Sequence, residues 1–283
     1  MALRVYTNNF SVSAQRHLGN NNDNLKTSLE RLSSGMRINR ASDDAAGLAI
    51  SEGMRGDIRS MKQAIRNAND GIGMINTAEG ALGEQASMLI RMRELASQAA
   101  TGTIGSAERV TINREFQALK DEIDRTAAVT EFNGQKLLDG SMSTAGTVSV
   151  VIQIGIAATN NDRISFNNSI DLTAITTTGL AIQNLVVTGV SDALSALAGI
   201  DSAINKVTDG RGRLGALQNR LMHTLQSLAV YTENLTNAES QVRDADYAAE
   251  ISEFTKNQIL SQASTAILAQ ANLVPQTVLQ LLG

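Results

Sequence analysis

A repeat of aliphatic side chains every seven residues runs through both halves of the chain, and it limits the fold to long helices packed along their length. In the first half, one row of the repeat is Met61, Ala68, Ile75, Leu82 and Leu89. A straight α-helix has 3.6 residues per turn, so a sustained period of 3.5 indicates helices that wind around one another. The sequence therefore predicts a mainly α protein in which long helices form a coiled-coil or helical-bundle rod.

The second half carries the longer repeat. Its main row steps by sevens through Ala193, Ile200, Val207, Leu214, Leu221, Leu228, Leu235 and Val242. A second row beside it contains Leu197, Ile204, Leu217 and Tyr231. The two rows together predict one long helix with a continuous apolar seam.

Shorter signals divide the chain between these repeats. Ser42 stands where the N-cap of the long first-half helix is expected, because a hydroxyl there can accept from a free backbone N–H. A further helix is expected from about 107 to 128. Between 146 and 170, apolar residues alternate with small or polar ones on both sides of the turn-prone segment Thr159-Asn160-Asn161-Asp162. This alternation predicts a small β-hairpin.

Both ends of the chain carry apolar rows, and the C-terminal end is uncharged. No residue after Lys256 has a charged side chain, through to Gly283. Amides and hydroxyls still recur every few positions, which a membrane span of ~20 residues does not tolerate. Such a neutral helix suits burial among protein segments, and we expect both ends to fold only when they meet partners. The expected assembly seams contain Leu25, Leu29, Leu32, Leu260, Ile267, Val274, Val278 and Leu281.

Composition argues against several classes of site. The chain has no Cys, so neither a disulfide nor a thiolate metal site can form. Its formal net charge of -4 leaves no basic stripe for nucleic acid. Its two histidines, His17 and His223, are too few for a catalytic triad or a metal cluster. We expect no catalytic residue, no cofactor and no metal, and hence a protein that is not an enzyme.

Two short patterns look like binding motifs but are given a structural interpretation. Gly210-Arg211-Gly212-Arg213-Leu214-Gly215 matches a dinucleotide fingerprint, yet it follows a helix, whereas that fingerprint follows a strand. We expect a flexible or kinked point in a long helix. The acidic cluster Asp121-Glu122-Asp124 has Lys120 and Arg125 beside it at helical spacing, which predicts a solvated helix face.

Longer motifs at both ends resemble those of one family. Leu32-Ser33-Ser34-Gly35-Met36-Arg37-Ile38-Asn39, followed by Asp43-Asp44-Ala45-Ala46-Gly47, is similar to the N-terminal signature of bacterial flagellins. Leu268-Ala269-Gln270-Ala271-Asn272 and Val274-Pro275-Gln276 resemble the flagellin C-terminus. The resemblance extends over residues 1–172 and 190–283, nearly the whole chain.

This resemblance implies a structural subunit that self-assembles into the helical bacterial flagellar filament for motility. It implies that residues 1–42 together with 243–283 form a terminal coiled-coil domain of the inner tube. Residues 43–242 would form a helical-bundle domain that includes the hairpin, with outer variable domains essentially absent. The filament is extracellular, and flagellins are exported by the flagellar type III apparatus, which fits a first ten residues without an apolar segment of signal-peptide length.

The resemblance also implies partners. These are other copies of the chain, a flagellar secretion chaperone on the C-terminal segment, and the cap and hook-junction proteins; neither nucleic acid nor membrane insertion is expected. Some flagellins are recognised by a Toll-like receptor of animal hosts through one helix. The residues at matching positions are Arg91, Arg93, Glu94, Leu95 and Glu115. The other interpretation of these residues is that they form contacts between subunits.

Two further functions compete with the filament subunit. A hook–filament junction protein shares end motifs with flagellins, but it would not elongate filament fragments. A cytoplasmic coiled-coil scaffold would be found inside intact cells and would be absent from sheared appendages.

Overall fold

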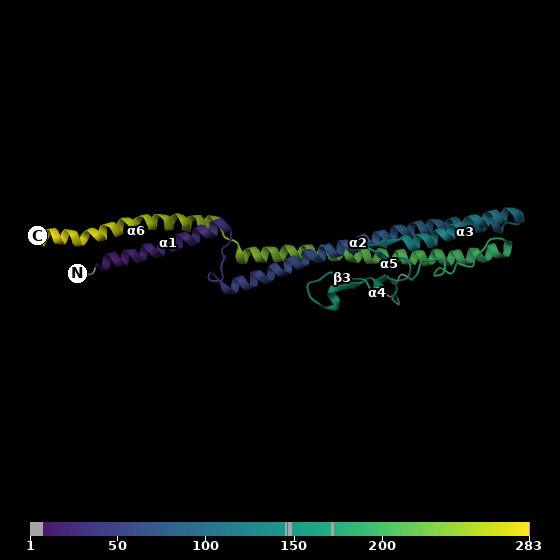
Figure 1. The fold of residues 1–283 in the computed structure, drawn as a ribbon, viewed down its shortest axis with the longest axis horizontal. Helices are drawn as coiled ribbons and strands as arrows, with labels where there is room; N and C mark the ends of the chain where they lie inside the picture. The colour runs from purple at the N-terminus through teal and green to yellow at the C-terminus, as the bar shows by residue number, and fades with distance from the viewer. Residues whose placement is uncertain (1–7, 145, 147–148, 171–172, 283) are drawn as a thin grey trace. The chain divides into compact units, whose positions relative to one another are not determined.

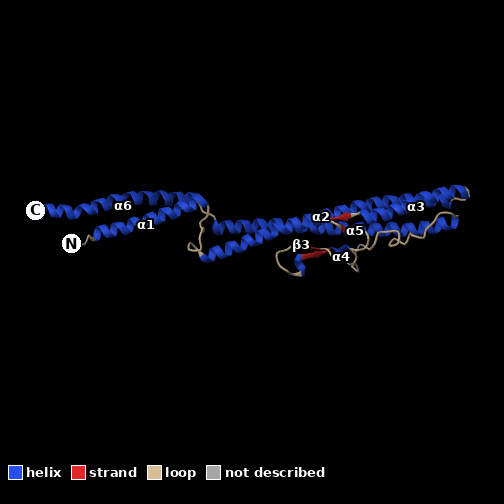
Figure 2. Ribbon diagram, in the orientation of Figure 1, coloured by secondary structure: helices blue, strands red, loops and turns tan. Residues whose placement is uncertain are grey.

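The structure, a computed structural model, describes residues 8–144, 146, 149–170 and 173–282, with side chains described as far as Leu273. Its elements in chain order are α1 (Asn9–Ser34), α2 (Ala45–Ala100), α3 (Ser106–Val129), β1 (Glu131–Phe132), β2 (Gln135–Lys136), β3 (Val151–Gln153), the 3-10 turn η1 (Asn160–Asp162), β4 (Arg163–Ser165), α4 (Phe166–Ile170), α5 (Val190–Arg243) and α6 (Tyr247–Leu282). Helix dominates and the strands are short (Figure 2), which confirms the predicted mainly α fold class.

The chain divides into two compact units. We call Met1–Gly56 with Asn234–Gly283 the terminal unit, and Asp57–Glu233 the bundle unit. Within the terminal unit, α1 and α6 lie side by side (Figure 1). Within the bundle unit, α3 lies along α2 and α5. The long helices α2 and α5 each contribute residues to both units.

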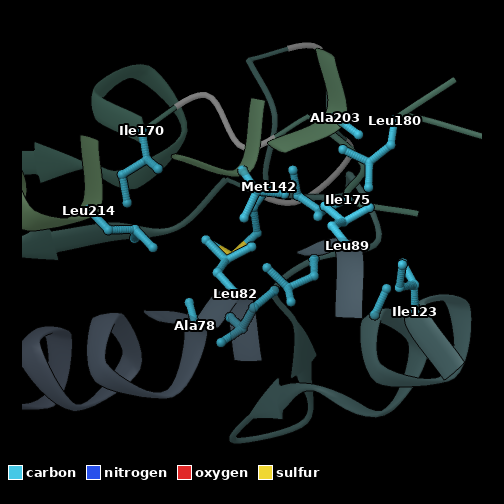
Figure 3. Close-up of a cluster of buried hydrophobic side chains, with 14 of the residues drawn as sticks. Ala78, Leu82, Leu89, Ile123, Met142, Ile170, Ile175, Leu180, Ala203 and Leu214 are labelled. Atoms are coloured by element: carbon cyan, nitrogen blue, oxygen red, sulfur yellow. The ribbon is translucent and has the colours of Figure 1, made fainter. Parts of the chain in front are cut away.

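The core of the bundle unit lies between α2, α3 and α5. The α2 row predicted from the seven-residue repeat is fully buried, from Met61 to Leu89. Figure 3 shows how Leu82 and Leu89 of this row share a cluster with Ile123 of α3 and Leu214 of α5. Aliphatic side chains from three helices therefore form one continuous core, as the repeat predicts.

The α5 row is buried over only part of its length. It is fully buried from Ala193 to Leu221 and half-buried from Leu228 onward. Tyr231, which we predicted in the second row, is 52% exposed, so that assignment is wrong. The glycine-rich stretch from Gly210 to Gly215 lies within the continuous helix α5 and follows no strand.

The start of α2 differs from the sequence-based expectation by two residues. Its cap is Asp44, whose Oδ1 accepts a hydrogen bond of 2.9 Å from the Gly47 backbone N–H. Ser42 is therefore not the N-cap. The neighbouring Asp43 accepts from the backbone N–H groups of Arg40 and Asn39, and these bonds hold the pKa of its carboxyl below the usual range. Both carboxylates stabilise the turn that precedes the helix.

Two short hairpins lie on the bundle unit. β1 pairs with β2 through a turn in which Asn133 and Gly134 have positive φ angles of 51° and 77°, as type I′ turns require. β3 pairs with β4, which confirms the predicted hairpin; residues 147 and 148, at the start of its predicted range of 146–170, lie outside the described residues. Ile152 of β3 approaches α2 so closely that a Cβ on Gly71 would lie 2.3 Å from its Cδ1.

The segment from 173 to 189 is ordered against α3 by polar side chains. Asp124 accepts from the Thr177 backbone N–H and hydroxyl, each at 2.7 Å. Lys120 is 6% exposed and donates to the carbonyls of Gln183 and Leu185. The expected solvated face is therefore wrong for Asp124 and for the adjacent Lys120, because an irregular segment covers this side of the helix. Burial lowers the pKa of Lys120.

None of the helices in the described part of the chain is both long and apolar enough to cross a membrane.

Candidate assembly interface

Within the terminal unit, α1 and α6 pair along faces that are mostly small or polar. The α1 residues on this face step by alternating intervals of three and four through Ser11, Ala14, Leu18, Asn21, Leu25, Ser28 and Leu32. The matching α6 series is Glu250, Phe254, Asn257, Ser261, Ser264, Leu268 and Ala271. All of these are buried or half-buried, whereas most residues between them are exposed. The spacing is that of a coiled-coil seam, and we call these two series the polar seam.

Hydrogen bonds from side chains cross the polar seam. Bonds of 2.8 or 2.9 Å run from Asn8 Nδ2 to the Ala271 carbonyl, from Ser11 Oγ to Asn272 Oδ1, from Asn21 Nδ2 to Ser264 Oγ, and from Ser261 Oγ to Asn22 Oδ1. A hydrogen bond of this kind stabilises a fold by only about 0.5–1.5 kcal/mol, whereas burial of one Leu or Ile contributes ~1.5–3 kcal/mol. These hydrogen bonds therefore specify the geometry of the pair more strongly than they add cohesion.

Beside the seam lies an open polar groove of about 530 Å³. Asn21, Asn24 and Ser28 line it from α1, and Lys256 and Asn257 line it from α6. Its walls are mainly amide, hydroxyl and charged groups, so its chemistry favours water over apolar side chains. At this groove the two helices are separated by a polar space, in contrast to the dense core of the bundle unit.

Backbone hydrogen bonds join the end of α1 to the start of α6, and we call this the closed end of the pair. Gly35 caps the C-terminal end of α1: its φ of 71° is left-handed, and its N–H donates to the Arg31 carbonyl. Gly35 then accepts from the Ala245 N–H at 3.0 Å, and the Arg37 N–H donates to the Arg243 carbonyl at 2.7 Å. These bonds tie the segment after α1 to the segment before α6.

An ion pair supports this closed end from α2. Arg243 Nη1 lies 2.8 Å from Glu52 Oε1. The hydrogen bond from Arg243 holds the pKa of the Glu52 carboxyl below its usual range.

The outer surface of the pair carries large apolar side chains. Those between 41% and 66% exposed are Phe10, Val12, Leu29, Tyr247, Ile251, Ile259, Leu260, Ile267 and Leu273. Single exposed apolar residues are common, but so many on two paired helices indicate a surface that contacts other protein. We call this set the outer apolar face.

The structure separates the predicted assembly seams into two groups. Leu25 and Leu32 are half-buried within the polar seam, whereas Leu29, Leu260 and Ile267 belong to the outer apolar face. Val274, Val278 and Leu281 lie beyond the described side chains. The polar seam itself emerges from the sequence only when Ser and Asn are counted among the heptad positions.

A second cluster of predicted residues lies on the bundle unit. Arg91 of α2 forms ion pairs of 2.9 Å with Glu94 and with Glu115 of α3. The bond to Glu94, and then that to Glu115, raises the pKa of the Arg91 guanidinium. Arg93 reaches Asp201 of α5 at 2.7 Å. These charged groups are about half exposed and cross-link three helices at the surface.

Leu95 does not belong to that surface. Its side chain is 2% exposed and lies in the core cluster, because it occupies the inward side of α2. Its placement with the four charged contact residues is therefore wrong for the folded bundle unit. An open groove of about 720 Å³ does lie beside the cluster, lined by Ile90, Arg93, Glu94 and Leu197 among others.

Within the described residues, no group of three or more His, Asp or Glu side chains is placed to hold a metal ion.

Two family models match the chain. Residues 5–143 match the model of the bacterial flagellin N-terminal helical region, and residues 197–282 match that of the bacterial flagellin C-terminal helical region.

Full-length relatives and a solved structure are also similar. A flagellin of Halalkalibacterium halodurans is 48% identical over 96% of this chain and 97% of its own length. A flagellin of Bacillus subtilis is 46% identical over 99% of this chain and 100% of its own. The solved structure of a putative flagellar hook-associated protein from Vibrio parahaemolyticus covers 71% of this chain and 100% of its own, with a TM-score of 0.58. At 13% identity, that last likeness concerns the fold alone.

Proposed function

The chain belongs to the bacterial flagellin family, and from that premise we propose how its structure builds a polymer. As a flagellin it is a structural subunit that self-polymerises into the bacterial flagellar filament, an extracellular fibre. Flagellins are a family of structural proteins. The proposal concerns which surface of this chain makes the contact between copies.

We propose that the outer apolar face of the α1–α6 pair is a principal contact between subunits. The observation that carries this proposal is that Leu29, Ile259 and Ile267 lie outside the polar seam and are each more than half exposed in the single chain. Apolar surface of this extent is favourable only when another protein surface removes it from water. A second copy of the chain supplies such a surface, since the protein is a homopolymer.

The absence of charge supports contact between copies over a long stretch of α6. Beyond Lys256 no side chain is charged, so identical helices can pack beside one another without repulsion between like charges. A contact that joins different patches of two copies does not close on itself, and such contacts generate open helical arrays. The filament is therefore the expected product of a repeated contact of this kind.

The test removes the apolar side chains without touching the polar seam. We expect Leu29→Gln combined with Ile267→Gln to raise the critical concentration for seeded elongation at least about tenfold. Full burial of each such side chain contributes ~1.5–3 kcal/mol, and each is more than half exposed in the single chain. Elongation is measured by light scattering and electron microscopy on sheared filament seeds.

The matched control changes exposed polar residues on the same two helices. Asn20→Gln with Thr265→Gln adds the same side chain at positions without apolar surface, and it should elongate like the unmodified protein. Normal elongation of the Leu29 and Ile267 variant would show that the outer apolar face is not a subunit contact.

The charged cluster on the bundle unit supports a second proposal. We propose that Arg91, Arg93, Glu94 and Glu115 form a contact surface, either for a neighbouring copy or for a Toll-like receptor of an animal host. They are about half exposed and are held in place by ion pairs between helices. Protection of these residues in assembled filaments, measured by hydroxyl-radical footprinting, would favour the neighbouring copy. Binding of monomer to the receptor, lost on Arg91→Ala, would favour the host receptor.

We retain three further proposals from the sequence. Residues 1–42 with 243–283 would form the inner tube of the filament, and 43–242 would form the surrounding helical-bundle layer. A secretion chaperone would cover the C-terminal segment before export, because the exposed apolar side chains of α6 need a partner until subunits meet. Cap and hook-junction proteins would contact the same terminal helices at the two ends of the filament.

A further inference from the structure

The inward face of the paired terminal helices combines polar and apolar side chains, and further large apolar side chains lie on the outer surface. Two amphipathic helices that meet in water normally pair through their apolar faces. Here the inward face carries Asn21, Ser28 and Ser264 between half-buried residues such as Leu25 and Leu268, while Leu29 and Ile267 remain outside. Because apolar side chains lie on both sides of the helices, hydrophobicity alone does not explain which faces the chain ends use for each other.

Directional hydrogen bonds explain why α1 and α6 pair by these faces. The bonds from Asn21 to Ser264 and from Ser261 to Asn22 form only when the seam residues of both helices point at each other. A rotation of either helix about its axis breaks these bonds. A buried Asn at a seam position of a coiled coil likewise fixes register and partner number, although it lowers stability.

The backbone hydrogen bonds at the closed end do not determine which helix faces meet along the whole pair. They hold the chain near Gly35 and Ala245. Asn21 lies fourteen residues before Gly35, which is about 20 Å along a helix at 1.5 Å per residue. Because those bonds hold the segments outside the two helices, each helix can still turn as a rigid rod about its own axis unless side chains resist it.

We propose that the polar seam determines which faces of α1 and α6 pair with each other. The hydrogen bonds of Asn21 and Asn22 with Ser264 and Ser261 select the face by which the two ends of one chain pair. They thereby keep the outer apolar face available for a second copy. This inference rests on the proposed subunit contact, but its test reads which faces of the two helices meet, which is a separate readout from the rate of polymer growth.

The chain has no Cys, so a disulfide between two introduced cysteines reports unambiguously on which faces meet. The seam reporter is Ser28→Cys with Asn257→Cys. Both positions are buried, and they lie seven residues from Asn21 and Ser264 respectively, in the direction of the closed end. The outer reporter is Ser28→Cys with Thr255→Cys, because Thr255 is exposed on the other side of α6.

The key variant replaces Asn21, Asn22, Ser261 and Ser264 with Ala. Alanine is a good helix former, so this change removes the hydrogen bonds without disfavouring the helices. The control variant replaces exposed residues of the same types with Ala, namely Asn20, Asn24, Ser33 and Ser252. Both variants are combined with each reporter and oxidised as assembled filaments, and the crosslinks within single chains are quantified on non-reducing gels.

With the native seam and in the control variant, the seam reporter should crosslink and the outer reporter should not. In the key variant, the ratio of seam to outer crosslinks should fall at least about fivefold, the factor that corresponds to one lost hydrogen bond. An unchanged ratio would overturn the proposal. So would a loss of both crosslinks, because the polar residues would then provide cohesion and not a choice of face. A fallen ratio together with normal elongation of the Leu29 and Ile267 variant would leave this inference standing and refute the proposed contact.

Discussion

Lys120 offers the sharpest test of how the bundle unit is held together. The residue is 6% exposed, and its ammonium group donates to the carbonyls of Gln183 and Leu185, at 2.5 and 3.2 Å. Lys120→Met keeps most of the aliphatic side chain but removes the donor. Hydrogen bonds from a charged donor contribute about 1.5–3 kcal/mol each, and an unsatisfied buried carbonyl costs ~1–3 kcal/mol. Leu185 keeps a bond from Gln117, so we expect a net loss of about 2–4 kcal/mol.

The control is Lys206→Met. Lys206 also donates to a carbonyl of the same segment, that of Gly179 at 3.0 Å, but its side chain is exposed. We expect it to cost under about 0.5 kcal/mol, since water replaces the lost donor. Urea unfolding followed by helical circular dichroism gives both free energies, and amide hydrogen exchange of Thr177 and Val187 locates the change. Equal stability of the two variants would refute a role for the buried ammonium.

The remaining predictions concern close packing and acid sensitivity. Gly80→Ala should raise the free energy of unfolding by about 0.5–1 kcal/mol, because nothing lies within 4 Å of its added Cβ and Ala is the better helix former. Gly71→Ala should not show that gain, because its Cβ would displace Ile152. Both variants are compared by urea unfolding, and an equal gain in stability would contradict the close approach of Ile152 to Gly71. The pKa of Glu52 is lower in the folded chain than its ordinary value of 4.5, so its stabilisation is present above that pH and declines as the pH falls. Glu52→Gln should therefore flatten the acid side of the stability curve, as measured by thermal unfolding between pH 6 and about pH 3.

The seven-residue repeat was sufficient to predict the long helices, because it depends only on which residues share a helix face. It did not reveal how many neighbours cover that face. Leu214 and Tyr231 occupy comparable rows of α5, yet one is 1% and the other 52% exposed. Nor did it reveal the segment that covers Lys120 and Asp124. A polar cluster on a helix has the same spacing whether it faces water or carbonyl groups, and those carbonyls belong to a loop without any periodic pattern.

At the candidate interface, the sequence could not predict which surfaces cover the apolar residues, because in a polymer the covering surface can belong to another copy. An amphipathic pattern shows that Leu29 and Ile267 must be covered, but not which molecule covers them. In a monomer, the nearest cover is the rest of the same chain, and an apolar seam between the two ends is the natural prediction. In a polymer the same cover can come from a second copy, and the contact within one chain is then free to be polar. Asn21 and Ser264 occupy heptad positions that a monomer would fill with aliphatic residues. Polar residues at such positions, beside exposed aliphatic ones, are therefore the sequence signal that distinguishes a subunit from a self-contained helical hairpin.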